Sequence, residues 1–308
     1  MDTKLNWVVV GVGDIATRRV IPAIQAEPRS RLHGVVTLVP QKGRVYSDRV
    51  WTSLDEALLD QAIDAVYVAT PNALHGPQTI ASLRAGKHVL CEKPMAMNYA
   101  EACEMARVAE ETGKTLGIAY YRRLFPKVLR AKALLADGAI GTPVYAEANC
   151  HSALPDRAWL LDPALAGGGP LYDIGSHRID VMNFLFGHPV RACGQRSNLV
   201  HKVAVEDNAT VMIEYASGVR GVVDVRWHST VARDQFRVMG TKGELNLDPL
   251  SGGALLHPGG VEDVPCHANV HLPCVANFVD AVLDGTPLAS SGASALWTDW
   301  VTEQVVIA

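Results

Sequence analysis

The sequence lacks several features that would assign it to a specialised class of protein. Its 308 residues include six cysteines, but these are scattered singly and never in CxxC spacing, so we expect neither a zinc site nor a disulfide scaffold. No apolar run approaches the roughly 20 residues that span a bilayer. The first residues lead directly into the apolar segment at Trp7, which leaves no room for a signal peptide. We therefore expect a cytoplasmic protein with reduced thiols and no membrane association.

Charge of one sign is also scarce. The 28 Lys and Arg residues against 32 Asp and Glu residues give a net charge of −4, without the basic stripe that nucleic-acid binding requires. We expect no nucleic-acid partner, and no metal, because no His, Cys and Asp cluster has ligand spacing. Hydrophobic residues make up 48% of the chain, an ordinary globular proportion. The length exceeds the roughly 250 residues at which a single core tends to divide, which predicts two domains.

Residues 1–118 alternate short apolar runs with helical patterns, as a parallel sheet with crossover helices requires. The expected strands are Asn6 to Val10, Leu32 to Val36, Val45 to Tyr46, Ala65 to Ala69, His88 to Cys91 and Thr115 to Ala119. Ser53 with Glu56, and Asn98 with Glu101, have the spacing of a helix capping box. This half is predicted to be a Rossmann domain with a doubly wound parallel sheet.

Two places interrupt that pattern. Residues 37–44, between the second expected strand and Val45, are too few for a full helical crossover. Pro22 lies inside the first expected helix, where it removes a hydrogen bond and should kink the axis.

Residues 119–308 have a different texture and are predicted to form an α+β domain with a large open, mostly antiparallel sheet. Gly, Asp and Ser turn signals separate its β-rich runs. The expected helices are Pro126 to Ala136, Leu171 to Phe186, Cys274 to Leu283 and Ala293 to Val306. The expected strands are Val144 to Asn149, Val190 to Val200, Ala209 to Tyr215, Val219 to Trp227, Gln235 to Met239 and Glu244 to Leu247.

A glycine-rich turn follows the first expected strand. Gly11, Gly13 and Ala16 form GxGxxA, in which glycine allows a tight turn and a close approach of the backbone to a pyrophosphate. Its position in a βαβ unit favours dinucleotide binding over the alternative, a strand-to-helix turn that binds nothing. We count Asp14 and Ile15, inside the turn, among the predicted cofactor contacts.

The acidic residue that usually follows such a turn by about 20 positions and binds the adenosine ribose is missing. The stretch reads VVTLVPQKGR, in which Thr37 is the only short polar side chain near the strand end and a predicted cofactor contact. Lys42 and Arg44 could meet a 2′-phosphate, which leans toward NADP over NAD. The alternative is that both are solvated loop charges.

Two further segments carry chemistry. In CEKP, Glu92 and Lys93 follow an expected strand, at the carboxyl edge of the sheet where open α/β folds bind ligands. Lys93 could bind a substrate hydroxyl and stabilise the charge on its oxygen; the alternative is a surface lysine. Asp173 and His177 lie four residues apart on an expected helix, so that a carboxylate could orient an imidazole general base. The alternative there is a contact on the helix surface.

These segments together resemble one known family. The GxGxxA turn, AVYVATPNALH (65–75), VLCEKP (89–94), YYRRLFP (120–126) and GGGPLYDIGSHRID (167–180) occur in the order seen in the glucose-fructose oxidoreductase/inositol dehydrogenase (Gfo/Idh/MocA) family. The resemblance covers nearly the whole chain. It implies a Rossmann domain, a large open sheet, and oxidation or reduction of sugars, cyclitols and related polyols with NAD or NADP.

The resemblance also implies roles for individual residues. The catalytic group would be Lys93, Asp173 and His177. The dinucleotide would be lined by Gly11, Gly13, Thr70, Asn72, His75, Glu92, Lys93 and Arg122. The substrate would meet Lys93, Tyr121, Arg123, Arg157, Trp159, Asp173 and His177. Leu124 stands where the family usually has an aromatic residue, and the shortened segment after Val36 departs from the family at the adenosine end.

The sequence thus predicts an NAD(P)-dependent dehydrogenase or reductase that moves a hydride between nicotinamide and a secondary alcohol or ketone. One alternative is a sensor that binds the dinucleotide without turnover. Another is a reductase of a non-sugar substrate such as a cyclic diol or tetrapyrrole. By analogy with the family, we expect a homodimer or homotetramer formed through the C-terminal sheet.

Overall fold

The computed structural model describes residues 4–307, and the expectation about a signal peptide therefore concerns a start of the chain that lies partly outside the described residues. The chain forms two compact units. The first unit comprises Met1–Tyr121 and His267–Leu296, and the second comprises Arg122–Cys266 and Trp297–Ala308. The sequence placed everything after residue 118 in the second domain, whereas residues 267–296 lie with the first unit.

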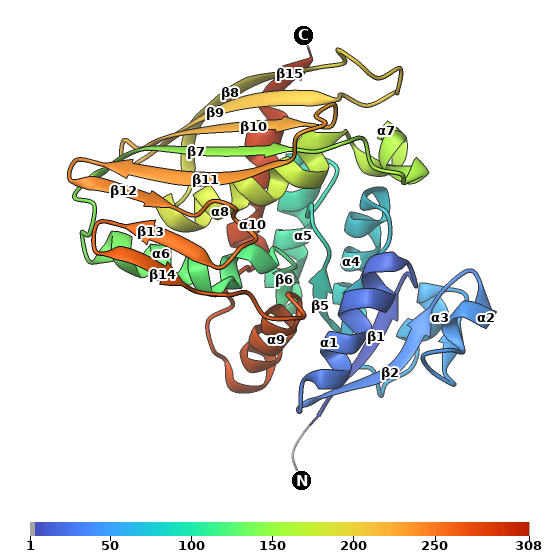
Figure 1. The fold of residues 1–308 in the computed structure, drawn as a ribbon. Helices are drawn as coiled ribbons and strands as arrows, with labels where there is room; N and C mark the ends of the chain where they lie inside the picture. Colours follow the sequence, from blue (N-terminus) through green and yellow to red (C-terminus); the bar gives the residue numbers. More distant parts are fainter. Residues whose placement is uncertain (1–3, 308) are drawn as a thin grey trace. The chain divides into compact units, whose positions relative to one another are not determined.

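The first unit is built on a parallel six-stranded sheet in the order β3-β2-β1-β4-β5-β6 (Figure 1). Every neighbouring pair is parallel, and the order places the first strand beside the centre, which confirms the doubly wound Rossmann arrangement. The strands are β1 (Leu5–Val10), β2 (Ser30–Val36), β3 (Val50–Trp51), β4 (Ala65–Val68), β5 (His88–Cys91) and β6 (Leu116–Ile118).

Helices cover both faces of this sheet. They are α1 (Ile21–Ala26), α2 (Pro40–Gly43), α3 (Leu54–Leu58), α4 (His75–Arg84), α5 (Tyr99–Thr112) and α9 (Leu272–Asp284). On one face Trp7 contacts Phe278 of α9, with ring centroids 5.2 Å apart. On the other face Val8 and Val66 belong to the same buried cluster as Met105 of α5. Burial on both faces explains why these strands are almost wholly apolar.

The position expected for the third strand is wrong. Val45 and Tyr46 form no strand; the third strand is Val50–Trp51, which pairs with Val35 and Val36. Trp51 lies over Gly34, where a Cβ atom would come within 2.3 Å of its ring, so only glycine leaves room for it.

The two capping predictions have different outcomes. Ser53 precedes α3 but makes no side-chain cap bond, so the capping box predicted there is wrong. Asn98 accepts a hydrogen bond from the backbone N–H of Glu101 at 2.9 Å, as predicted.

Pro22 lies at the start of a helix, so no hydrogen bond is lost from the interior of that helix. Residues Ala16–Val20 form a π-turn directly before α1, and the N–H of Ile21 bonds to the carbonyl of Ala16. Pro22 then occupies one of the first two positions of α1, where a helix tolerates the absent N–H.

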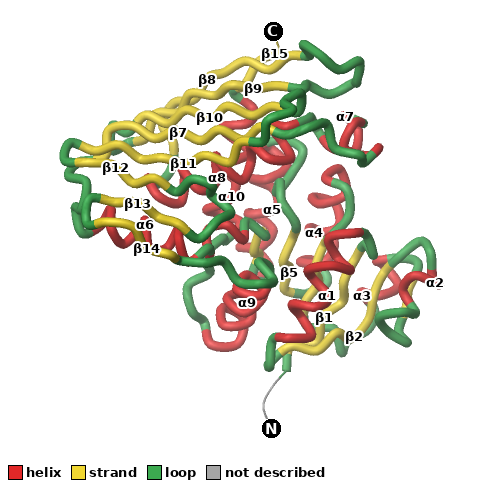
Figure 2. The backbone as a smooth tube through the Cα atoms, in the orientation of Figure 1, coloured by secondary structure: helices red, strands yellow, loops and turns green. Residues whose placement is uncertain are grey.

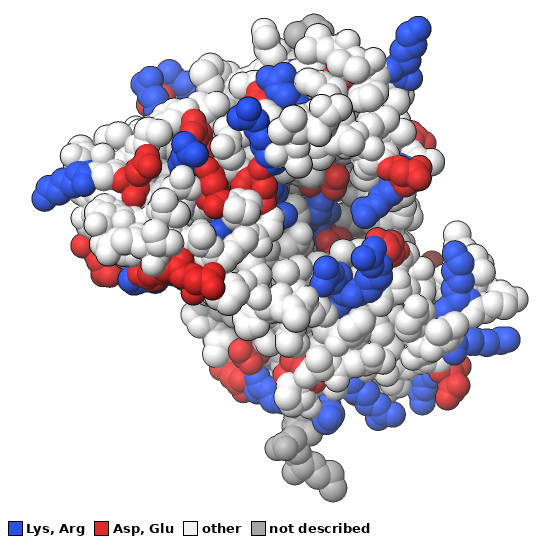
Figure 3. Space-filling model, in the orientation of Figure 1, with Lys and Arg blue, Asp and Glu red and all other residues white. Residues whose placement is uncertain are grey.

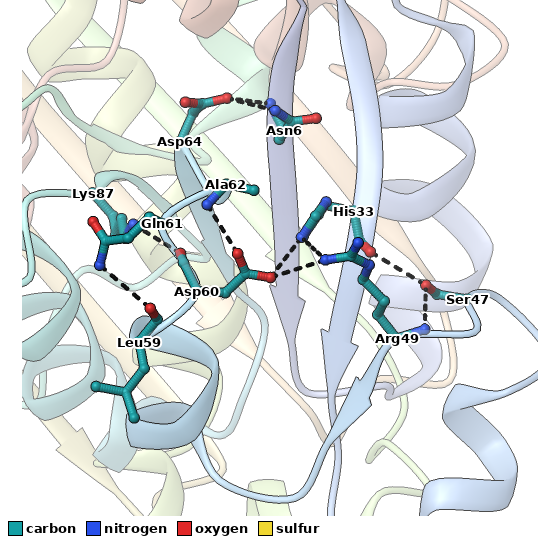
Figure 4. Close-up of polar contacts among 10 residues, drawn as sticks. All are labelled: Asn6, His33, Ser47, Arg49, Leu59, Asp60, Gln61, Ala62, Asp64 and Lys87. Atoms are coloured by element: carbon teal, nitrogen blue, oxygen red, sulfur yellow. Dashed lines mark hydrogen bonds and ion pairs between the residues drawn. The ribbon is translucent and has the colours of Figure 1, made fainter.

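A polar cluster holds the amino edge of the same sheet (Figure 4). Asp60 Oδ2 lies 2.8 Å from His33 Nε2 and 3.0 Å from an Arg49 nitrogen, while Oδ1 accepts the Ala62 N–H at 2.9 Å. The Lys87 ammonium donates to the backbone carbonyl of Asp60 at 3.1 Å. These contacts tie the turn before β4 to β2 and β5.

The second unit contains a nine-stranded sheet in the order β14-β13-β12-β11-β7-β10-β9-β8-β15 (Figure 2). It is mostly antiparallel, as expected, but β7 with β10 and β8 with β15 are parallel pairs. Its strands are β7 (Pro143–His151), β8 (Pro189–Ser197), β9 (Asn208–Tyr215), β10 (Arg220–Arg226), β11 (Arg233–Gly240), β12 (Gly243–Asn246), β13 (Ala254–His257), β14 (Gly260–Asp263) and β15 (Val305–Ile307). The last three were not predicted.

The helices of the second unit are α6 (Pro126–Ala136), α7 (Pro163–Ala166) and α8 (Ser176–Phe186), while α10 (Gly292–Glu303) has its first residues in the first unit and its remainder in the second. The last helix was expected to reach Val306, but it ends at Glu303 and the chain continues as β15. Within residues 4–307 no helix is long and apolar enough to cross a membrane. On the face shown in Figure 3, basic and acidic side chains are interspersed and no continuous basic stripe is seen.

Candidate active site

The glycine-rich turn lies where β1 meets its helix, at the carboxyl edge of the parallel sheet. Gly11 has φ of 92°, and a Cβ there would approach the carbonyl oxygen of Ala69 to 2.7 Å, so both its conformation and its surroundings require glycine. Gly13 differs, because no heavy atom lies within 4 Å of the place where its Cβ would be. Ala16 is fully buried against the strand. The turn is therefore tight on one side and open on the other.

The open side of the turn borders a pocket of about 330 Å³. Its lining residues are Val12, Gly13, Asp14, Thr17, Lys42, Val45 and Tyr46. Gly13 and Asp14 were predicted cofactor contacts, and the shortened segment after β2 supplies the opposite wall. A close backbone approach beside open space fits a diphosphate, so the residues present suit a dinucleotide.

Four other predicted cofactor residues lie beside this turn or nearby. Ile15 is half-buried within it. Thr37 follows β2 directly, and its hydroxyl accepts the Val39 N–H at 3.3 Å. The Thr70 hydroxyl donates to the side-chain oxygen of Gln78 at 2.7 Å, and Asn72 is 3% exposed. Each is held by the protein itself, which leaves their contact with a cofactor a prediction.

His75 has a role that the sequence did not indicate. Its ring is buried between two backbone carbonyls, with Nδ1 2.8 Å from Pro94 O and Nε2 2.9 Å from Thr70 O. Burial lowers the pKa of His75, in spite of these acceptors and the nearby Glu92 charge. The histidine ties the loop after β4 to the loop after β5. Its contact with the dinucleotide stays a prediction.

Lys93 follows β5 at the carboxyl edge, as predicted, and is half-buried. The preceding Glu92 is buried, and its carboxylate accepts from the Tyr67 hydroxyl at 2.8 Å and from His271 at 3.1 Å. Burial pushes the pKa of Glu92 upward, but the hydrogen bond and charge of His271, together with Tyr67 and Lys93, outweigh it and hold that pKa below its usual range. Glu92 is thus a buried carboxylate with partners inside the first unit, and its contact with the cofactor stays a prediction.

Tyr121 also belongs to this part of the first unit. It opens a short 3₁₀ turn, Tyr121–Leu124, shortly after β6. Its ring contacts that of His271, with centroids 4.6 Å apart. The sequence signalled Tyr121 through its motif but gave no indication of His271.

The second unit carries Asp173 and His177. The expected helix from Leu171 is present, but Leu171–Gly175 form a π-turn and the α-helix proper, α8, begins at Ser176. His177 is 4% exposed and Asp173 is half-buried. A π-turn widens the first turn of a helix and occurs often at functional sites. The α-helical spacing that placed these two side chains on one face therefore does not apply unchanged, and their pairing stays a prediction.

The arginines after Tyr121 have separate environments. Arg122 is half-buried, with its guanidinium 5.3 Å from the centre of the Phe125 ring. Arg123 is 3% exposed, and its Nε donates to both carboxylate oxygens of Asp180 at 3.0 and 2.9 Å. Burial raises the pKa of Asp180 although Arg123 opposes the shift. Arg123 thus binds Asp180 of α8, and its contact with the substrate stays a prediction.

The two residues predicted at the substrate mouth come before α7. Arg157 is exposed, whereas Trp159 packs against a small buried cluster that contains Leu160, Ala166 and Trp227. Among residues 4–307, no three His, Cys, Asp or Glu side chains gather as metal ligands.

Comparison with known proteins gives matches to both halves of the chain. A model of an oxidoreductase family with an NAD-binding Rossmann fold matches residues 5–120, and a model of the GFO/IDH/MocA C-terminal domain matches residues 128–246. The 1,5-anhydro-D-fructose reductase of Ensifer adhaerens is 31% identical over 95% of this chain and 92% of its own. The trans-1,2-dihydrobenzene-1,2-diol dehydrogenase of Oryctolagus cuniculus is 33% identical over 74% of this chain and 70% of its own.

The fold has a similar match among solved structures. The crystal structure of an aldose-aldose oxidoreductase from Caulobacter crescentus, complexed with glycerol, aligns with a TM-score of 0.89 and 30% identity. The alignment covers 97% of this chain and 96% of that one.

Proposed function

Because the chain belongs to the GFO/IDH/MocA oxidoreductase family, with an NAD-binding Rossmann domain, we propose that it is an NAD(P)-dependent dehydrogenase or reductase of sugars, cyclitols or related polyols. A nicotinamide held by these residues would supply the hydride chemistry, with transfer from the carbon of a CH–OH group or to that of a ketone. In the oxidation, His177 takes the hydroxyl proton, Lys93 stabilises the oxygen and Asp173 orients the imidazole. The reduction uses the same groups in reverse.

One observation carries the proposal. The open glycine turn and its 330 Å³ pocket lie at the carboxyl edge of the parallel sheet, and Lys93 follows β5 at that same edge. In open α/β sheets, ligands bind at the carboxyl ends of the strands. The residues around Gly13 would thus hold a dinucleotide at the edge of the sheet that also carries Lys93.

The sugar assignment draws support from two relatives. The Ensifer protein is named for 1,5-anhydro-D-fructose and the Caulobacter protein for aldoses. The exposed guanidinium of Arg157 offers hydrogen-bond donors to hydroxyl oxygens, in agreement with a polar substrate.

The test is direct. The purified protein is titrated with NADH and NADPH by fluorescence and then screened against aldoses, inositols and keto-sugars at the nicotinamide absorbance band. We expect saturable cofactor binding and turnover of at least one polyol. Tight cofactor binding without turnover of any member would instead identify a dinucleotide sensor.

A cyclic diol is the second candidate substrate. The Oryctolagus enzyme, named for trans-1,2-dihydrobenzene-1,2-diol, is 33% identical to this chain. Trp159, half-buried beside an apolar cluster, supplies an aromatic surface that a ring of low polarity would favour. Comparing kcat/KM for a cyclic diol and for matched aldoses separates the two classes.

The residues of the pocket that would hold the adenosine end of the cofactor favour NADP over NAD. Lys42 lines the pocket beside Gly13, and Asp14 is the only acidic residue among the lining residues. An ammonium in this position can bind a 2′-phosphate, whereas ribose hydroxyls alone call for an acceptor. In isothermal titration, we expect 2′,5′-ADP to bind more tightly than ADP.

Substitution of Lys42 sharpens that test. Lys42→Ala should weaken 2′,5′-ADP binding about tenfold and leave ADP binding nearly unchanged, because it removes one charge-assisted contact. Arg44→Ala is the matched control, since Arg44 is exposed on the same segment and does not line the pocket. Equal affinity for ADP and 2′,5′-ADP would argue for NAD.

The assembly is a homodimer or homotetramer formed through the nine-stranded sheet. Its face away from α8 presents the side chain of Met212, 56% exposed, beside Cys193 and Thr210 on the same strand pair. Exposed apolar groups on a broad face are typical of interfaces. Sedimentation of the wild type and of Met212→Glu tests this: loss of assembly in the variant supports it, and a monomeric wild type contradicts it.

The cytoplasm is the proposed location. All six cysteines are free, which agrees with a reducing compartment. Cell fractionation with an antibody against the protein checks it.

A further inference from the structure

A buried carboxylate lies directly before Lys93. Glu92 is 6% exposed, and its Oε1 accepts hydrogen bonds from the Tyr67 hydroxyl at 2.8 Å and from His271 Nε2 at 3.1 Å. Its Oε2 accepts from the backbone N–H of Lys93 at 3.3 Å. A buried carboxylate is costly unless its oxygens are hydrogen bonded. These three donors therefore fix the orientation of Glu92.

His271 supplies a donor that the sequence around Glu92 lacks. It is 1% exposed and immediately precedes α9, 179 positions beyond Glu92 in the chain. Because the carboxylate oxygen accepts, His271 Nε2 must carry a hydrogen. Nδ1 has no hydrogen-bond partner among the described residues. Among the described residues, Glu92 is thus the hydrogen-bond partner of the imidazole ring, through Nε2.

The same imidazole supports an aromatic ring. His271 and Tyr121 have centroids 4.6 Å apart and planes inclined by 38°. Tyr121 belongs to the segment that the family resemblance associates with the nicotinamide and the substrate. One buried residue therefore contacts both the carboxylate before Lys93 and the tyrosine of the YYRRLFP motif.

The residue after Lys93 is anchored as well. The carbonyl of Pro94 lies 2.8 Å from His75 Nδ1, and the His75 ring is fully buried. The main chain of Lys93 is thus held on its amino side through Glu92 and on its carboxyl side through Pro94. A side chain attached to a backbone fixed on both sides explores fewer positions.

We propose that His271 is a positioning residue for the redox site: its Nε2–H fixes Glu92 and its ring supports Tyr121, so that Lys93 and Tyr121 keep a single placement. This inference rests on the proposed function, in which Lys93 binds the substrate oxygen. His271 acts through its two neighbours and contacts neither substrate nor dinucleotide.

The arrangement has a pH signature. The groups that face Glu92 are His271 before α9, Tyr67 on β4, the adjacent Lys93, and His75 on α4. Together they keep the pKa of Glu92 low, so its carboxylate remains charged as the pH falls. Without the His271 donor the burial of Glu92 raises its pKa, and the acid limb of the activity profile moves to higher pH.

Three variants separate positioning from packing. His271→Phe keeps a ring against Tyr121 and removes the donor, whereas His271→Gln keeps an N–H donor and removes the ring. Cys274→Ala is the packing control, because Cys274 is buried one turn further along in α9 and the variant keeps both the donor and the ring of His271. Thermal denaturation establishes that each variant is folded, and fluorescence titration gives its dinucleotide Kd.

The first measurement does not depend on turnover. The acylation rate of each lysine by an amine-reactive ester is followed by mass spectrometry, with the other lysines as internal references. We expect Lys93 to be labelled several-fold faster in His271→Phe, and at the wild-type rate in His271→Gln and Cys274→Ala. An unchanged Lys93 rate in a folded His271→Phe protein, or the same increase in Cys274→Ala, overturns the proposal.

The second measurement uses any substrate found. We expect kcat to fall about tenfold or more in His271→Phe, with dinucleotide Kd unchanged and the acid limb shifted to higher pH, because misplacement of a reacting group lowers the chemical step. His271→Gln should retain most of kcat and the wild-type acid limb. If Lys93 labelling changes as expected but the wild type turns over no polyol, the proposed function fails while the positioning role stands.

If His271→Phe does not fold, Glu92→Gln replaces it. The amide keeps the shape of Glu92, but its single oxygen cannot accept from both His271 and the Lys93 N–H, so one of these contacts is lost. Lys93 should then be labelled faster than in the wild type, and an unchanged labelling rate in the folded variant contradicts the proposal.

Discussion

The parallel sheet carries a histidine and carboxylate pair at each edge, and the two pairs differ in burial. At the amino edge His33 meets Asp60 at 2.8 Å, with the Asp60 side chain 22% exposed and the flanking Arg49 side chain 57% exposed. At the carboxyl edge His271 meets Glu92 at 3.1 Å, with side-chain exposures of 1% and 8%.

Burial changes what such a pair can contribute. Water and salt screen the amino-edge cluster, and its side chains can leave their contacts at small cost, so it adds modestly to stability. Water cannot replace the partners of Glu92, so that network fixes orientation in addition to adding stability. A histidine and carboxylate pair thus adds to stability at the amino edge, and at the carboxyl edge it also fixes the orientation of neighbouring side chains.

The largest expected effect concerns the two lysines that lie before and after β5. Lys87 precedes the strand and bonds to the Asp60 carbonyl, while Lys93 follows it at the carboxyl edge. Lys93→Met should lower kcat by a factor of about 10² to 10⁴, because it removes the group that stabilises the substrate oxygen. Dinucleotide Kd and the melting temperature should change little. Steady-state kinetics, fluorescence titration and calorimetry measure the three quantities.

Lys87→Met is the matched control at the other end of the same strand. It removes one hydrogen bond and should cost about 1 kcal/mol of unfolding free energy, with kcat unchanged. Equal losses of activity in the two variants would mean that the edges of the sheet do not differ in function.

A buried pair in the second unit extends the comparison. Asp180→Ala leaves the Arg123 guanidinium buried without its carboxylate partner, which should destabilise the protein by about 3 to 5 kcal/mol. Because Asp180 is on α8, three residues after His177, kcat should fall as well. Chemical denaturation and kinetics measure these effects. The double variant Arg123→Met with Asp180→Leu should regain much of the stability, since no buried charge remains; if it is as unstable as Asp180→Ala, the cost lies in packing.

The framework of the first unit could be predicted because parallel strands buried on both faces leave a strong apolar signal. The strand His88–Cys91 was predicted with its observed bounds, and Leu5–Val10 within one residue. The third strand was misplaced at Val45 because that apolar pair is as β-like as Val50 and Trp51 are. What selects the latter pair is the fit of Trp51 over Gly34, a tertiary contact that no local pattern shows.

For a similar reason, the positions of candidate site residues could be predicted but their partners could not. A motif places a residue at a sheet edge, as it did for Gly11 and Lys93, but it does not show which way each side chain points. The motifs gave no sign that Glu92 contacts His271 or that Arg123 contacts Asp180, 179 and 57 positions away. Contacts over such separations form only when the chain folds, so these partners were not visible in the sequence.

The smallest expected effect belongs to the amino edge and to its pH dependence. The hydrogen bond from His33 and that from the Ala62 N–H, with the His33 and Arg49 charges, lower the pKa of Asp60 against a small opposing effect of burial. A carboxyl whose pKa is lowered by folding stabilises the protein above its unfolded pKa of about 4, and that stabilisation is lost as the pH falls through the folded value. Asp60→Asn should therefore cost about 1 kcal/mol near pH 7, and the variant and wild type should converge at acid pH. Urea denaturation at several pH values, with Asp48→Asn as the exposed control in the same unit, measures the difference; a cost that remains constant down to pH 3 would show that shape, and not charge, holds this edge.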